Sequence, residues 1–353
     1  MDMLIEKFER MSQYNDGLEW RLTQEGLLGP EANVLSNRPS DFDQAVHFLN
    51  QPRYLQWDSR LLPRNDPYAA FNMFRYANAM AETHHDLVNA IFDFVANQPF
   101  KDSGEMYRVL KSVDFLPSSS STNVGMRDMD THLSSPPAQT EVDFTEPNYY
   151  TSIPPNIQPA YCWGSNMSDL NPKLRDFPPL RRTVLPFLTS TATNDLANYD
   201  RYLLAPNLFL EVSKPHDPLA AAELECRMGG AFGARALYKL CTHHDYIRAA
   251  IIAAAAPPSV ASGTTGSVPF SPSYHGEILS FSAGYGDGTL KLFAHWIHHD
   301  VGSQSEKLEY RMIQLGAWAM TGEIDSFARG VVAFQNMVDL ASVKRNGITL
   351  MGD

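Results

Sequence analysis

The stretch Pro206-Asn207-Leu208-Phe209-Leu210-Glu211-Val212-Ser213-Lys214 is a short, mainly apolar run with two charged residues near its end. The apolar core of this run predicts a buried strand. Because an ionised group is costly to bury unless it is paired or coordinated, Glu211 and Lys214 are expected either to form an ion pair or to serve a function. As an exposed pair at a strand end they would contribute only ~0–1 kcal/mol.

The sequence on either side of this run predicts an α/β fold. We expect a strand over 203–212 and then a helix that opens at Pro218, where a missing N–H costs nothing. Two strands, 277–283 and 289–297, form a hairpin around an Asp-Gly step. Helices are expected over 309–320 and 324–340. The fold class is therefore a small mixed sheet flanked by helices.

Glycines cluster in the expected helix after Pro218, at Gly229, Gly230 and Gly233. They do not follow a strand directly, as the glycines of a phosphate-binding loop would. Close packing of the helix against the sheet is the interpretation that we favour.

The N-terminal part, from about residue 39 to 100, has apolar residues at helical spacing over 68–77 and 87–95. Between these two runs, His84 and His85 point to different faces of a helix and do not form a metal-chelating pair. Serine and proline dominate 117–159, which is typical of a flexible linker, and 257–272 is a second expected loop. We predict a helical N-terminal region (1–116), a Ser/Pro-rich linker (117–159) and an α/β domain (160–345).

Composition excludes several classes. The formal net charge is -12, which argues against general electrostatic binding of DNA or RNA. No apolar run is long enough for a transmembrane helix, and the first residues do not have the pattern of a signal peptide. Three scattered cysteines make no disulfide framework, so a reducing compartment, cytoplasmic or nuclear, is expected.

Four segments of the C-terminal half resemble a large group of uncharacterised fungal proteins that is similar to the PD-(D/E)XK nuclease superfamily. The resemblance is carried by 205–211, by 229–236, by Tyr285-Gly286-Asp287-Gly288-Thr289-Leu290-Lys291 and by 310–322, and it covers roughly residues 155 to 342. It implies a restriction-endonuclease-like fold and metal-dependent hydrolysis of phosphodiester bonds in DNA or RNA.

In such a nuclease an Asp and a Glu on neighbouring strands hold Mg²⁺ or Mn²⁺ through oxygen ligands, and a Lys positions the attacking water. The resemblance makes Glu211 the metal carboxylate, Lys214 the lysine and Glu225 a supporting polar residue. Nucleic acid would then lie along the basic residues Lys173, Arg175, Arg181 and Arg182.

The chain departs from the family pattern at two positions. Relatives carry Glu-x-Lys, but here Ser213 stands two residues after Glu211, and a slip of one residue turns a strand side chain to the other face. Lys214 would reach the site only through a bulge or from beyond the strand end. Upstream, Ala160 stands where relatives have Asp, so that Asp169 or Asp176 would have to replace the missing ligand.

These departures predict a nuclease-fold protein with impaired catalysis. The alternative is a non-catalytic binding or interaction protein on the same scaffold, with a protein partner on the N-terminal helices. A different enzyme chemistry on this scaffold is a third, weaker possibility. A metal site at His295, His298 and His299 is disfavoured, since His295 and His299 are too far apart on a strand to share one ion.

Overall fold

The computed structural model describes residues 27–30, 38–55, 57, 66–96, 108–111, 159–166, 203–215, 217–255, 276–299 and 308–349. Two expected loops, 117–159 apart from its last residue and 257–272, therefore lie outside the described residues.

Seven strands form one mixed sheet in the order β1-β7-β6-β5-β4-β3-β2. Parallel pairing joins β1 to β7 and β4 to β5, and the other neighbours are antiparallel. In chain order the strands are β1 (Leu27–Leu28), β2 (Arg108–Lys111), β3 (Tyr161–Asn166), β4 (Leu203–Val212), β5 (Ile278–Gly286), β6 (Thr289–His299) and β7 (Leu308–Ala319). The expected α/β class, a mixed sheet with flanking helices, is confirmed.

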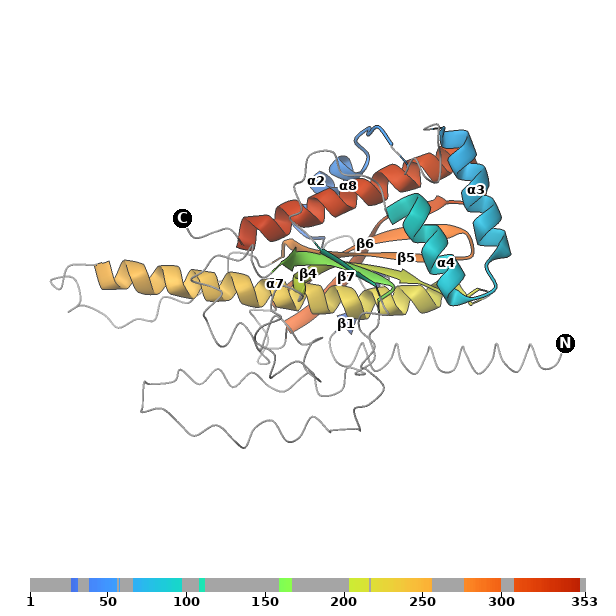
Figure 1. Cartoon of the computed structure of the whole chain (residues 1–353). Helices are drawn as coiled ribbons and strands as arrows, with labels where there is room; N and C mark the ends of the chain where they lie inside the picture. Colours follow the sequence, from blue (N-terminus) through green and yellow to red (C-terminus); the bar gives the residue numbers. More distant parts are fainter. Residues whose placement is uncertain are drawn as a thin grey trace, which may run out of the picture.

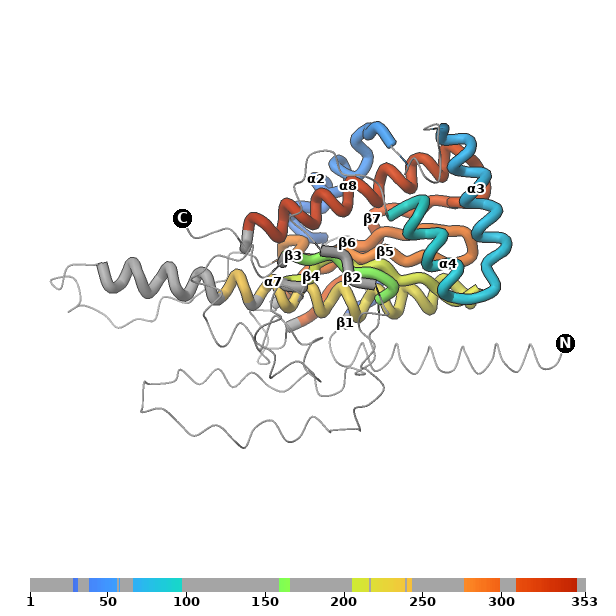
Figure 2. Tube along the Cα trace, viewed as in Figure 1, coloured from blue at the N-terminus to red at the C-terminus, as the bar shows by residue number. Residues whose placement is uncertain are grey.

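One long helix, α7 (Leu219–Ala255), connects the parallel strands β4 and β5 and lies along one face of the sheet. The other face carries α8 (Ile324–Thr349) together with the N-terminal helices α2 (Phe42–Leu49), α3 (Pro67–Met80) and α4 (His84–Ile91), which continues into a π-helix, η3 (Phe92–Ala96). Figures 1 and 2 show this three-layer arrangement. The sheet is thus enclosed between helices of different chain regions.

The apolar core between the sheet and α8 includes the N-terminal helices. Phe74 of α3 stacks on Phe327 of α8, with ring centroids 5.3 Å apart, and contacts Tyr285 of β5 edge-on. On β3, Trp163 meets Phe334 of α8 at 5.7 Å. The N-terminal helices share one apolar cluster with the sheet; the segment boundaries expected at 116 and 159 stay predictions.

Local sequence explains where these elements begin and turn. Asp287 and Gly288 both have positive φ, 48° and 68°, which is the conformation of a two-residue hairpin turn and which an Asp-Gly step favours. At the start of α4, Thr83 and Asp86 cap each other's backbone N–H groups. The hairpin and the two N-terminal helical runs are confirmed.

The helix expected over 309–320 is wrong, because this segment is β7. Its residues pair with β6 from Leu308 to Ala319, with one register shift between Leu292 and Phe293, and this long antiparallel pairing outweighs the helical spacing of its apolar residues. Tyr310 and Met312 are buried two residues apart, as a strand requires. The helix expected over 324–340 is confirmed and continues to Thr349.

Within the described residues, no helix is both long and apolar enough to cross a membrane. The glycines of α7 pack closely on the sheet, as expected: a Cβ on Gly230 would overlap the ring of His295, and one on Gly233 would lie 2.7 Å from Phe209.

Candidate functional site

The strand β4 is buried on both faces, and its alternation directs Glu211 toward α7. Leu208, Leu210 and Val212 belong to the apolar cluster that contains α8 and the N-terminal helices. Phe209 and Glu211 point the other way, where a Cβ on Gly229 of α7 would lie 3.5 Å from Glu211 Oε1. Glu211 is consequently only 1% exposed.

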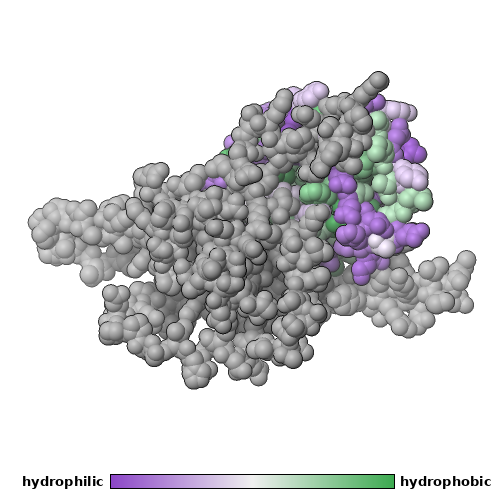
Figure 3. Space-filling view, viewed as in Figure 1, coloured by the Kyte–Doolittle hydropathy of each residue, from purple (hydrophilic) through white to green (hydrophobic). Residues whose placement is uncertain are grey.

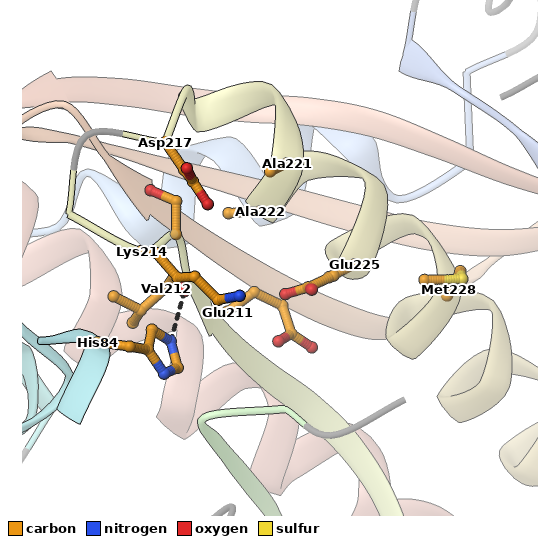
Figure 4. Close-up of a pocket in the computed structure, with 10 residues that line it drawn as sticks. His84, Glu211, Val212, Lys214, Asp217, Ala221, Ala222, Glu225 and Met228 are labelled. Atoms are coloured by element: carbon orange, nitrogen blue, oxygen red, sulfur yellow. Dashed lines mark hydrogen bonds between the residues drawn. The ribbon is translucent and has the colours of Figure 1, made fainter. Parts of the chain in front are cut away.

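A cavity of about 320 Å³ opens where β4 ends and α7 begins. Its ionisable lining residues are His84, Glu211, Lys214, Asp217 and Glu225, and its other lining residues are Val212, Ser213, Ala221, Ala222 and Met228. Figure 4 shows Lys214 extending toward the carboxyl groups of Glu211 and Glu225. The three residues that the resemblance singled out as catalytic therefore share one cavity.

Glu211 is the most perturbed acid of this cavity. Burial raises its pKa well above the usual value, the charge of Glu225 raises it further, and a hydrogen bond from the backbone N–H of Ala160 opposes both effects. The Oε1 atom has no hydrogen-bond partner. An unpaired buried acceptor is destabilising, so this oxygen is available to a donor that enters the cavity.

Glu225 faces Glu211 from the second turn of α7. Burial raises its pKa, the Lys214 ammonium lowers it, and Asp217 raises it. Lys214 is exposed and lies two residues beyond the end of β4. Its position past the strand end, and not a bulge, brings its side chain to the cavity despite the shifted register.

Two ionisable lining residues, His84 and Asp217, were not identified as site residues from the sequence. His84, dismissed there as a metal ligand, has its Nε2 atom 2.7 Å from the carbonyl oxygen of Val212; the Nε2–H donates, because a carbonyl only accepts. The capping box that starts α4 at Thr83 is the sequence signal that places His84 in the first turn. Asp217 lies in the turn between β4 and α7, where its backbone N–H donates a hydrogen bond to the carbonyl oxygen of Lys214.

Beneath Glu211, α7 and the sheet enclose a small polar group. Ser282 lies 2.7 Å from His295 Nε2 and also bonds to Cys226, whose pKa is raised by burial and by Glu211. Burial lowers the pKa of His295 to about 3, so the imidazole is neutral at pH 7. His295 is thus a buried residue with a hydroxyl partner, packed against Gly230.

Ala160 lies directly beside Glu211. The β3–β4 register pairs Tyr161 with Leu210, and one further step of this antiparallel ladder places Ala160 opposite Glu211. The hydrogen bond from the backbone N–H of Ala160 to the carboxyl group of Glu211 agrees with that placement. The position at which the sequence lacks the expected aspartate is therefore adjacent to the carboxylate that it would assist.

The described residues do not fit a Mg²⁺ or Mn²⁺ site. They contain no group of three His, Cys, Asp or Glu side chains that could hold a metal ion, and the side chain of Ala160 offers no ligand atom. Asp169, expected to complete the site, and Asp176 lie outside the described residues, as do the basic residues Lys173, Arg175, Arg181 and Arg182.

Comparisons of the chain with protein-family models, with curated proteins and with solved structures gave no significant match.

Proposed function

We propose that this chain is a nuclease-fold protein, related to the metal-dependent phosphodiester hydrolases of the PD-(D/E)XK superfamily that act on DNA or RNA, in which catalysis is impaired. The observation that carries the proposal is the adjacency of Ala160 and Glu211 on neighbouring strands. Such nucleases need two carboxylates at these places to hold a divalent ion. Here one is present and the other is replaced by a methyl group.

The position of Lys214 adds support. A lysine that reaches the same cavity as Glu211 and Glu225 is what the superfamily's chemistry requires, even though it comes from one residue later in the chain. The proposal places the protein in the cytoplasm or nucleus, where nucleic acid is found.

Restoring the missing carboxylate tests the proposal. Calorimetric titration with Mn²⁺ and with Mg²⁺ would compare the parent chain, Ala160→Asp, and Ala160→Asp combined with Glu211→Gln. We expect Mn²⁺ binding to appear in Ala160→Asp and to be lost in the double variant, which keeps the new aspartate but removes the older ligand. Tight binding by the parent would show an intact metal site, and no binding by Ala160→Asp would remove the support for nuclease ancestry.

A second candidate, a non-catalytic interaction protein, is favoured by the surface of α3. Tyr68, Met73, Tyr76 and Met80 are large apolar side chains that are 42–69% exposed on this one helix. Figure 3 shows apolar residues at the surface, beside hydrophilic ones, in the region where α3 lies. A pull-down with the parent and with Tyr68→Ser/Tyr76→Ser would separate the candidates, since only the interaction protein needs these tyrosines.

A further inference from the structure

The cavity at the end of β4 is lined by more acidic than basic side chains. Three carboxyl groups, those of Glu211, Asp217 and Glu225, line it against one ammonium group, that of Lys214. The three acids come from β4, from the turn before α7 and from the second turn of α7, so that the acidic lining is a property of the strand-to-helix connection. A cluster of acids alone does not define a site, because many are merely hydrated.

The buried oxygen of Glu211 distinguishes this cluster from a hydrated one. Glu211 is 1% exposed, and its Oε1 atom has no hydrogen-bond partner among the described residues, although the residue lines the cavity. A buried acceptor gains most from a donor that also carries positive charge. The missing third ligand excludes a complete metal site within the described residues, which leaves an organic cation.

We propose that this cavity binds the primary ammonium group of a small aliphatic amine, which donates a hydrogen bond to Glu211 Oε1 and pairs with Glu225. The inference concerns the same cavity as the proposed function, but it rests on the acidic lining of the cavity and on the unpaired Oε1 atom of Glu211, and not on nuclease ancestry.

Size and lining define the ligand further. A volume of about 320 Å³ lies at the small end of ligand-binding pockets. Val212, Ala221, Ala222 and Met228 contribute apolar atoms to its walls, which suits a short hydrocarbon chain behind the charged head. The ligand chemistry is therefore an alkylammonium group, present either in a free amine or in a lysine side chain.

Lys214 is the competitor that the fold supplies. Its ammonium is close enough to Glu225 to lower the pKa of that carboxyl group, and its side chain extends toward both glutamates from the exposed rim (Figure 4). The ammonium group of Lys214 thus competes with an external ammonium group for the two glutamates. Removing it should strengthen binding of the amine.

The test is a calorimetric titration of the full chain, in EDTA, with butylammonium chloride. The matched control ligand is butyltrimethylammonium, which has the same charge but no N–H donor. We expect saturable binding of one butylammonium per chain and binding at least about tenfold weaker for the trimethylated ligand. Nα-acetyl-lysine methylamide, titrated in parallel, distinguishes a lysine side chain from a free amine as the source of the group.

Three variants make the assignment specific. Glu211→Gln keeps the shape but replaces the Glu211 carboxyl group by an amide that cannot ionise, and should weaken butylammonium binding at least about tenfold. Asp43→Asn is the control, because Asp43 is an exposed acid of α2. Asp41, at the start of α2, bonds to Ile278 at the start of β5, about 20 Å along that strand from Gly284, the partner of Glu211; binding should not change. Lys214→Met should tighten binding about threefold or more.

Absence of saturable butylammonium binding by the parent, equal binding of the trimethylated ligand, or no effect of Glu211→Gln would each overturn the inference. Saturation by Mg²⁺ alone, in a titration without EDTA, combined with no butylammonium binding, would overturn it in favour of a metal site. The proposed function stands or falls separately, because its test depends on Mn²⁺ binding by Ala160→Asp and not on amines.

Discussion

The backbone N–H of Ala160 donates a hydrogen bond to the carboxyl group of Glu211 across the β3–β4 pair. This bond joins the two residues on which the proposed nuclease ancestry depends. Both are buried, with 2% of Ala160 and 1% of Glu211 exposed. The hydrogen bond from this N–H lowers the pKa of Glu211, whereas burial and the charge of Glu225 raise it.

Placing a second acid beside Glu211 should destabilise the metal-free protein. In Ala160→Asp two carboxyl groups would share a buried site, and we expect the free energy of unfolding to fall by about 2 kcal/mol or more. Urea denaturation at pH 8 in EDTA measures this change. If the two acids repel each other, Glu211→Gln should recover part of the loss; equal losses with glutamate and glutamine at 211 would contradict that cause.

The stability of the protein should decrease with pH through the titration of Glu211. Its pKa is raised above the ordinary value of 4.5, so the folded state holds this proton more tightly than the unfolded state does. The stabilisation is complete below about pH 4.5 and is lost as pH rises toward the folded-state pKa, by up to about 1.4 kcal/mol per pH unit.

Glu211→Gln removes this proton, so the stability of the variant relative to the parent should rise with pH above 4.5. Urea denaturation at closely spaced pH values from 4 to 8 gives the difference directly. A difference that stays constant over this range would show that Glu211 has an ordinary pKa in the folded protein. The comparison cancels the titration of groups that the two proteins share.

The sequence predicts most of the C-terminal sheet because the relevant signals are local. The strand β4 follows from the apolar residues on both sides of Pro206 and Asn207, and the β5–β6 hairpin follows from its Asp287-Gly288 step. The strand β7 could not be recognised in this way. Its apolar residues fit helical spacing as well as strand spacing, and only pairing with β6, which depends on residues elsewhere in the chain, decides between the two.

In the site, too, the sequence predicts the residues that local signals bring together and misses the one that comes from a distant segment. Glu211, Lys214 and Glu225 are close in sequence, and the expected strand and helix bring them to one cavity. His84 comes from a helix more than a hundred residues away, and nothing in the local sequence indicates that α4 packs against the end of β4. The residues at 169–182 expected to contribute ligands and basic charge lie outside the described residues, so their contribution stays a prediction.

His84 should hold the N-terminal helices against the site. His84→Ala leaves the Val212 carbonyl, now bonded at 2.7 Å, without this donor, and should lower the free energy of unfolding by about 1 kcal/mol. His85→Ala is the matched control, because His85 is the next residue of α4 and is exposed. Thermal denaturation of both variants measures the difference; equal destabilisation would assign the effect to α4 itself and not to the bond with β4.

Close packing of α7 on the sheet, which positions Glu225 opposite Glu211, should be sensitive to a single methyl group. In Gly230→Ala the new Cβ would overlap the buried ring of His295, and neither α7 nor the paired strand β6 can move away freely. We expect a loss of about 1–3 kcal/mol in the free energy of unfolding.

Gly347→Ala is the control. This glycine also lies in a helix, α8, but a Cβ there meets nothing within 4 Å. Alanine at this position should stabilise the protein by up to about 1 kcal/mol through its better helix propensity. Urea denaturation of both variants measures whether the free energy of unfolding falls for Gly230→Ala and rises for Gly347→Ala. A Gly230→Ala variant as stable as the parent would show that α7 does not pack on His295 as closely as the structure has it.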